Sequence, residues 1–254
     1  MTANDIINII ESVAPLSSQE GWDNSGLQIG SRETVVSRCL LCTDITLAAV
    51  EEAIEKGCEM VLSHHPLLFH GLKTIQGLTE RERVVMRAVR EGLVIYSSHT
   101  PMDKYLHGVS GRMAERLGIK EYDYLSPDCL GVVGNLPKAV SIGELMKSVK
   151  AAFACRVIRY SLPVLGMGEV QRVALCGGAG AEYMEAAKQM GADVFISADF
   201  KYHDFQAARD IIAVMDIGHF ESEQYTKEVF AELLAGTVEC VMAETDRSLV
   251  EVEV

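Results

Sequence analysis

The sequence is poor in aromatic residues and has no hydrophobic run long enough to cross a membrane. Aromatic residues make up 6% of its 254 residues and Trp22 is its single tryptophan, although 48% of the residues are hydrophobic. An aliphatic core of this kind suits a parallel sheet covered by helices. The first residues also lack the basic segment that begins a signal peptide. We therefore expect a soluble protein of the cytoplasm.

Positive charge is the scarcer sign. The sequence has 23 Lys and Arg residues against 36 Asp and Glu residues, which gives a formal net charge of −13 and a pI near 5.0. Nucleic acids and anionic membranes attract basic surfaces. The composition therefore argues against a nucleic-acid-binding protein, and we expect no membrane partner.

The seven cysteines are an odd number, and several of them lie inside apolar runs. Buried, reduced thiols are the expected form of such residues. Cys39 and Cys42 have the C-x-x-C spacing of some zinc sites, but the residues between them are typical of a strand. The sequence has no second pair that would complete a zinc cage.

Apolar strands and amphipathic helices alternate along the chain. Helical spacing predicts helices over residues 4–14, 46–56, 79–91, 108–117, 141–153 and 221–235. Short apolar runs predict strands over residues 39–42, 59–62, 93–96, 130–136, 155–160 and 238–243. This order is typical of an α/β fold with mostly parallel strands.

Two stretches of the chain align with each other without a gap. Residues 38–63 match residues 172–197 at a constant offset of 134, with seven identical residues. Both stretches have the pattern strand, turn, helix, glycine, strand. Such a repeat predicts two related α/β subdomains of similar topology that face each other across a cleft. We place them at residues 1–125 and 126–254, with the chain end able to pack back on the first.

A second match, at an offset of 120, aligns functional residue types. It pairs His99 with His219 and Asp103 with Glu223. Each pair follows an apolar strand, so the two halves repeat polar residues as well as core residues.

Two adjacent histidines follow the strand predicted over residues 59–62. They are His64 and His65, and Pro66 comes directly after them. The proline favours extended backbone at His65 and has no N–H group for a sheet. We expect both imidazoles at the carboxyl end of a strand, where open α/β sheets place their ligands.

Carboxylates and a third histidine also follow predicted strands. Asp103 lies in a loop after one strand, and His219 and Glu223 are four residues apart at the start of a helix. Together with the adjacent histidines they form a candidate metal site. Each residue also has a structural interpretation, because the His219 and Glu223 pair can be a helix-surface pair and Asp103 can cap a turn.

Imidazole and carboxylate donors suit particular metals. They favour Zn²⁺, Fe²⁺, Mn²⁺, Ni²⁺ or Co²⁺ over Mg²⁺ and Ca²⁺, which prefer oxygen ligands alone. A glutamate can bridge two such ions about 3.5–4 Å apart. Two-metal sites of this kind are typical of phosphatases, nucleases and amidohydrolases.

Other polar residues are weaker candidates. His99 and His203 can transfer protons or support the metal ligands, or they can be structural histidines. Asp44, which follows a strand, and Lys201 are candidates for substrate contacts.

Two glycine-rich segments have open interpretations. Residues 21–30 contain too many turn residues for a helix, and they form either a structural turn packed by Trp22 or a loop that lines a site. Residues 177–180 precede a predicted helix, and their N–H groups could bind an anion.

Five motifs in order resemble those of the Nif-three-like family, also called GTP cyclohydrolase I type 2 homologues or dinuclear metal centre proteins. They are GWDNSGL (residues 21–27), SHHP (63–66), HTPMD (99–103), SADFKYH (197–203) and GHFESE (218–223). The resemblance covers essentially the whole chain. It is closest to the short form of the family, because residues 125–170 leave no room for the inserted middle domain of longer members.

The resemblance implies two α/β subdomains, a dinuclear metal centre in the cleft and a toroidal homohexamer. Its metal ligands map onto His64, His65, Asp103, His219 and Glu223, and Glu223 is the implied bridge. Two functions compete. The first is a metal-dependent hydrolase that acts on a small phosphorylated or nucleotide-like substrate. The second is a non-enzymatic metal-binding ring that serves as scaffold, metal chaperone or regulatory partner.

Overall fold

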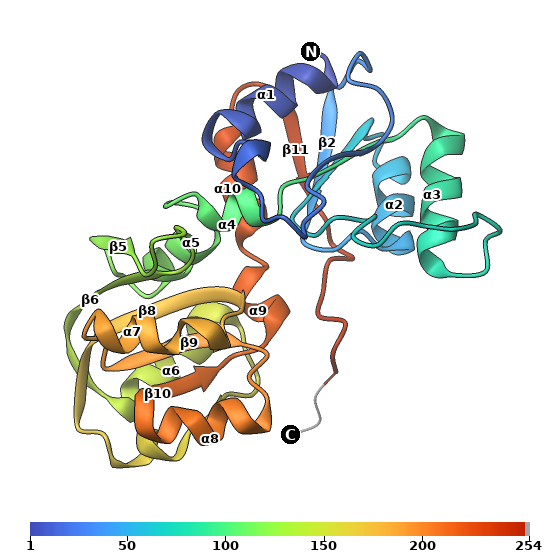
Figure 1. Ribbon diagram of the computed structural model, residues 1–254. Helices are drawn as coiled ribbons and strands as arrows, with labels where there is room; N and C mark the ends of the chain where they lie inside the picture. Colours follow the sequence, from blue (N-terminus) through green and yellow to red (C-terminus); the bar gives the residue numbers. More distant parts are fainter. Residues whose placement is uncertain (252–254) are drawn as a thin grey trace. The chain divides into compact units, whose positions relative to one another are not determined.

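The computed structural model describes residues 1–251, and contacts divide the chain into two compact units (Figure 1). Unit 1 comprises Met1–Met102 and Thr226–Arg247, and unit 2 comprises Asp103–Tyr225 together with residues 248–251. The sequence placed the division at residue 125. The two divisions differ because α5 (Val109–Arg116) packs its buried side chains into the core of the second sheet.

Unit 1 is built on a five-stranded sheet in the order β1-β4-β3-β2-β11. Its strands are β1 (Gly26–Ile29), β2 (Arg38–Cys42), β3 (Met60–Ser63), β4 (Val94–Ser97) and β11 (Glu239–Met242). The last four are parallel, and β1 is antiparallel to β4. The end of the chain thus supplies an edge strand beside β2.

Helices cover both faces of this sheet. Side chains of α2 (Leu47–Glu55) and α3 (Glu80–Glu91) pack on one face, and α10 (Thr226–Leu233) contacts both β2 and α1 (Ala3–Val13). Local sequence sets the helix ends. Thr46 and Thr79 cap the first turns of α2 and α3, and Gly92 ends α3 in the left-handed region at φ 68°.

Unit 2 has a mixed six-stranded sheet in the order β5-β6-β8-β9-β10-β7. Its strands are β5 (Tyr122–Tyr124), β6 (Val132–Ser141), β7 (Arg159–Tyr160), β8 (Glu169–Ala179), β9 (Val194–Ala198) and β10 (Ala213–Asp216). The three strands β8, β9 and β10 are parallel, and the other pairings are antiparallel.

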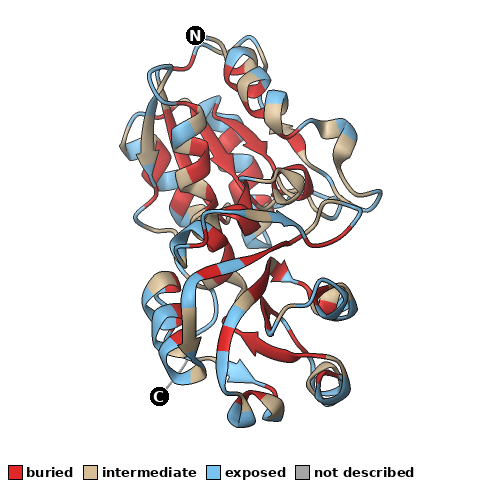
Figure 2. Ribbon diagram, turned by 90° about the vertical axis from the view of Figure 1, so that its left-hand side faces the viewer, coloured by how far each residue is buried: buried red, intermediate tan, exposed pale blue. Residues whose placement is uncertain are grey.

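The second sheet is also covered on both faces. One core layer includes side chains of α5 and α6 (Ile142–Phe153), and the other includes those of α7 (Met184–Gln189) and α8 (Tyr202–Ile211). Figure 2 shows the central strands of each sheet largely buried while the outer helix faces are exposed. Parallel strands with two covered faces explain the continuous apolar runs in the sequence.

The internal repeat is confirmed in the strand register. Leu40 of β2 pairs with Val61 of β3, and Ala174 of β8 pairs with Phe195 of β9. Both residues of the second pair lie 134 positions after those of the first. The prediction of two α/β units of similar topology is therefore correct.

The repeat extends to polar contacts at the strand starts. The Glu59 carboxylate accepts from the backbone N–H of Arg38, and the Asp193 carboxylate accepts from that of Arg172. The guanidinium of Arg38 donates to the carbonyl of Lys56, and that of Arg172 donates to the carbonyl of Met190. Each residue in unit 2 again lies 134 positions after its counterpart.

The segment 177–180 differs from the expectation of an anion-binding helix start. Strand β8 runs through it to Ala179. The N–H of Gly177 donates to Ser110 Oγ, and the N–H of Gly178 donates to Ser222 Oγ. Both amides therefore hold unit 2 together.

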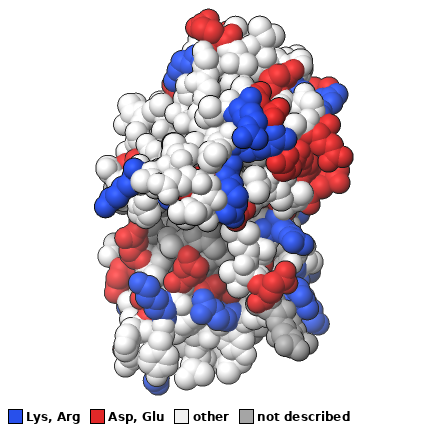
Figure 3. All heavy atoms as spheres, turned by 90° about the vertical axis from the view of Figure 1, so that its right-hand side faces the viewer, with Lys and Arg blue, Asp and Glu red and all other residues white. Residues whose placement is uncertain are grey.

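The charged surface residues and the cysteines agree with what the composition predicts. Figure 3 shows acidic and basic side chains beside one another over α2 and α3, where Arg87 pairs with Glu51 and Glu91. All seven cysteines are free thiols, as expected, and five of them are buried, whereas Cys129 and Cys240 are partly exposed. Within residues 1–251, no helix combines the length and apolar composition needed to cross a bilayer.

Candidate metal centre

The carboxyl ends of β3 and β4 position three histidines in unit 1. Ser63 at the end of β3 donates to the carbonyl of His65 at 2.8 Å, and its Oγ lies 2.8 Å from Oγ of Ser97 at the end of β4. These bonds join the two strand ends. His64 and His65 follow the first, and His99 follows the second.

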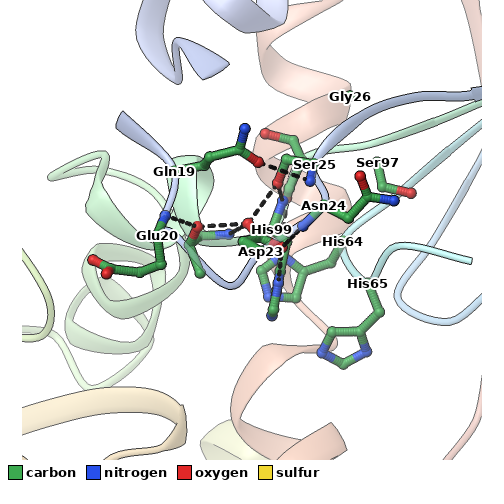
Figure 4. Close-up of polar contacts among 12 residues, drawn as sticks. Gln19, Glu20, Asp23, Asn24, Ser25, Gly26, His64, His65, Ser97 and His99 are labelled. Carbon is green, nitrogen blue, oxygen red and sulfur yellow. Dashed lines mark hydrogen bonds and ion pairs between the residues drawn. The ribbon is translucent and has the colours of Figure 1, made fainter. Parts of the chain in front are cut away.

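The three imidazoles form a compact cluster (Figure 4). Ring centroids are 4.9 Å apart for His64 and His65, 5.3 Å for His64 and His99, and 5.5 Å for His65 and His99. One ring nitrogen from each lies within 4.8 Å of the others. His64 is fully buried, whereas the other two are half-buried.

Each ring of this cluster donates its Nδ1–H to a protein oxygen that can only accept. His64 donates to the Ser98 carbonyl at 3.1 Å, His65 to Asp44 Oδ1 at 2.9 Å and His99 to Asp23 Oδ1 at 2.8 Å. The neutral form of each ring therefore has its lone pair on Nε2. Metal-binding histidines have this tautomer, held by an oxygen on the other nitrogen. The cluster thus fits a transition-metal ion.

Asp23 is a residue of this cluster that the sequence analysis did not single out. Its side chain is fully buried, and it also accepts hydrogen bonds from Ser25 and Thr100. Burial opposes its ionisation, but hydrogen bonds from His99, Thr100 and Ser25 hold the pKa of Asp23 well below its usual value. The loop 21–30 therefore lines the histidine cluster.

Trp22 in the same loop does not pack a structural turn. It is 60% exposed, and its ring lies 5.9 Å from the rings of both Phe69 and His99. Of the two interpretations of this loop, the structure supports the one in which it lines a site.

Unit 2 holds its own histidine between two carboxylates. In α9 (His219–Glu223), Nε2 of His219 lies 3.0 Å from Glu223 Oε2, and Nδ1 lies 2.7 Å from Asp199 Oδ2. Burial lowers the pKa of His219, but the bonds to Asp199 and Glu223 outweigh it and raise the pKa to about 11. The pair predicted from the four-residue spacing is therefore in direct contact.

Asp199, which bonds His219, has an unusual backbone conformation. It directly follows β9 and has φ 58°, in the left-handed region that few non-glycine residues adopt. The offset of 134 places it opposite His65, but the residue types differ, so the internal repeat does not reveal its role, although Asp199 lies in the motif at residues 197–203.

Three further candidates lie on helices or at a helix start. Asp103 is half-buried in α4 (Thr100–Lys104). His203 is exposed on α8, with Nδ1 3.3 Å from Gln206 Oε1. Lys201 is exposed, and its backbone N–H donates to Asp204 at the start of the same helix.

Solved structures share this fold. A hypothetical protein of Staphylococcus aureus superposes with a TM-score of 0.89 at 22% identity, covering 100% of this chain and 99% of the other. A Bacillus cereus protein related to NIF3 gives the same TM-score at 20% identity, with 99% of each chain covered.

Curated relatives and a family model agree with this similarity. A Clostridium perfringens protein named GTP cyclohydrolase 1 type 2 homolog is 34% identical over 230 residues, 88% of this chain and 87% of its own length. A Clostridium acetobutylicum protein of the same name is 30% identical over 250 residues, 94% and 91% of the two chains. The model of Duf34/NIF3 (NGG1p interacting factor 3) matches residues 1–248. The chain therefore belongs to the Duf34/NIF3 family.

Proposed function

We propose that this chain is a metal-dependent hydrolase that binds two divalent transition-metal ions. The ligands are His64, His65, Asp103, His219 and Glu223, and Glu223 is the bridging carboxylate. The metals are drawn from Zn²⁺, Fe²⁺, Mn²⁺, Ni²⁺ and Co²⁺, which accept mixed imidazole and carboxylate ligands. When bound, such ions supply Lewis acidity and lower the pKa of water.

The observation that carries the proposal is the shared tautomer of the unit 1 histidines. His64, His65 and His99 all use Nδ1 to donate to an oxygen, so each presents Nε2 as the basic nitrogen. A structural histidine can make the same bond, but here one nitrogen of each ring also lies within 4.8 Å of the others, which suits a shared ion. The contact of His219 with Glu223 supplies a second set of donors of the expected types.

Other residues are given supporting roles. We assign proton transfer to His99, whose ring is held by the buried Asp23 carboxylate, and less directly to the exposed His203. Asp44 and Lys201 are assigned to substrate contacts. The substrate is a small phosphorylated or nucleotide-like molecule, in keeping with the names of the Clostridium relatives.

The proposal includes a toroidal homohexamer. Large apolar side chains are exposed in the 3-10 helix Leu162–Gly166, where Leu162 is 64% and Leu165 is 65% exposed. Exposed apolar side chains of this size commonly lie at subunit contacts. Light scattering after gel filtration should give about six times the 27.8 kDa chain mass. A monomer mass would contradict the assembly but not the metal site.

A substrate screen on metal-loaded protein tests the hydrolase. The metal found by elemental analysis of the purified chain is restored, and nucleotides and phosphoesters are then tested for turnover. We expect hydrolysis that is lost in Glu223→Gln. Stoichiometric metal without any turnover would instead favour the non-enzymatic metal-binding assembly.

A further inference from the structure

The segment that follows β11 carries a buried carboxylate that holds the turn after β2. The Asp246 side chain is only 1% exposed. It accepts from the N–H of Thr43 at 3.1 Å, from Thr43 Oγ1 at 3.0 Å and from the N–H of Asp44 at 3.3 Å. Lys227 of α10 lies 2.6 Å from it and balances its charge. All these residues belong to unit 1.

The turn that Asp246 holds is attached to His65 at two points. The backbone N–H of His65 donates to the carbonyl of Thr43 at 2.9 Å. Its Nδ1 donates to Oδ1 of Asp44, also at 2.9 Å. The position of this imidazole therefore depends on the Thr43–Asp44 turn. Asp246, about two hundred positions later in the sequence, holds that turn in place.

We propose that Asp246 is a positioning residue of the metal centre. By fixing the Thr43–Asp44 turn, it sets the direction and the tautomer of the His65 imidazole. The inference rests on the proposed metal site, but it concerns a residue that is not a ligand. Partners that orient a metal-binding histidine commonly contribute tenfold or more to metal affinity.

The chain offers a matched control in the same segment. Glu52 of α2 accepts from the N–H of Glu244 at 2.8 Å, from the N–H of Thr245 at 2.9 Å and from Thr245 Oγ1 at 2.6 Å. Glu52 thus holds the two residues that precede Asp246 in the sequence. Among its described contacts, none is to Thr43, Asp44 or His65. Glu52→Gln loosens the segment but leaves the turn's own acceptor in place.

The experiment compares Asp246→Asn with Glu52→Gln in the full chain. Zn²⁺ affinity is measured by competition with a chelator, and the visible spectrum is recorded with Co²⁺ bound. We expect Asp246→Asn to weaken Zn²⁺ binding about tenfold and to change the Co²⁺ spectrum. Glu52→Gln should lower the unfolding temperature but keep the affinity within about twofold and the spectrum unchanged. Wild-type behaviour of Asp246→Asn, or equal losses in both variants, would overturn the proposal.

Two further measurements keep the test decisive. If Asp246→Asn does not fold, Thr43→Val removes one bond to Asp246 and should weaken Zn²⁺ binding about threefold. If the wild-type chain binds no metal, the proposed function fails. The inference is then tested without metal, by ¹⁵N NMR of the histidine rings. We expect the Nδ1–H tautomer of His65 to lose population in Asp246→Asn, and an unchanged tautomer would contradict the inference.

Discussion

Nδ1 of His99 lies 2.8 Å from Oδ1 of Asp23, a residue 76 positions earlier in the chain. The other oxygen of this carboxylate accepts from the N–H and hydroxyl of Thr100. The Asp23 carboxylate is the acceptor in each of these hydrogen bonds. An asparagine at this position would turn its NH₂ group toward one of the donors, and two donors cannot form a hydrogen bond. The pair fixes which nitrogen of His99 carries the proton.

Asp23→Asn should therefore weaken metal binding. The amide favours the wrong tautomer of His99, whose ring supports those of the proposed ligands His64 and His65 at centroid distances of 5.3 and 5.5 Å, and we expect Zn²⁺ affinity to fall about tenfold or more. Isothermal titration measures the change. Asp5→Asn is the matched control, because within residues 1–251 the Asp5 side chain accepts from Thr2 alone, at the start of α1 and outside the cluster. Equal affinity in the two variants would contradict the role of Asp23.

Replacing the proposed ligand His64 should remove metal, whereas replacing an exposed histidine should not. His64 is fully buried in the cluster, so His64→Gln should lose more than half of the bound metal in elemental analysis. His107→Gln serves as the control, because this exposed ring contacts Tyr122 of unit 2. Retention of full metal content by His64→Gln would exclude His64 as a ligand.

Trp22 should report directly on metal binding at the histidine cluster. It is the only tryptophan, and its ring centroid lies 5.9 Å from that of His99. Because Ni²⁺ and Co²⁺ quench nearby indoles, we expect tryptophan emission to fall on titration with either ion and to recover with excess chelator. Unchanged emission in protein shown by elemental analysis to carry metal would place the ion elsewhere.

The contribution of Glu52 to stability should depend on pH. Burial opposes its ionisation, but bonds from Lys56, Thr245 and the backbone of Glu244 lower its pKa from 4.5 to about 2. Because the folded pKa lies below the unfolded one, the ionised form stabilises the fold above pH 4.5, and this contribution is lost as the pH falls toward 2.

We expect Glu52→Gln to lower the free energy of unfolding by about 2 kcal/mol at pH 7 and by less than half of that near pH 3. Urea denaturation at the two pH values measures both differences. If Glu52→Gln lowered the free energy of unfolding equally at the two pH values, the carboxylate charge would not be the stabilising feature.

Periodicity and the internal repeat predicted much of the architecture. The strands β2, β3 and β4 and the helices between them lie within a few residues of their predicted positions, because apolar runs and threonine caps are local signals. Strand β1 was missed because four residues between turns carry little periodicity. The predicted helix 221–235 divides into α9 and α10, and its apolar spacing does not reveal the break.

The site was predictable only in part. His64 and His65 stand out because a buried strand stops at two histidines and a proline, and strand ends are where α/β sheets place ligands. Asp23 and Asp199 lie in two of the quoted motifs, but nothing local identifies their partners, and Asp246 lies in none of the motifs. Each acts through a bond to a residue distant in sequence, so only the folded chain shows which aspartates orient histidines.

The most direct test of the central claim is the metal stoichiometry of the purified chain. The protein is loaded with excess Zn²⁺, freed of loose ions by gel filtration and analysed by plasma mass spectrometry. We predict two ions per chain in the wild type and one or fewer in Glu223→Gln, which lacks the proposed bridging carboxylate. A folded wild-type chain that retains no stoichiometric metal would contradict the proposed dinuclear centre.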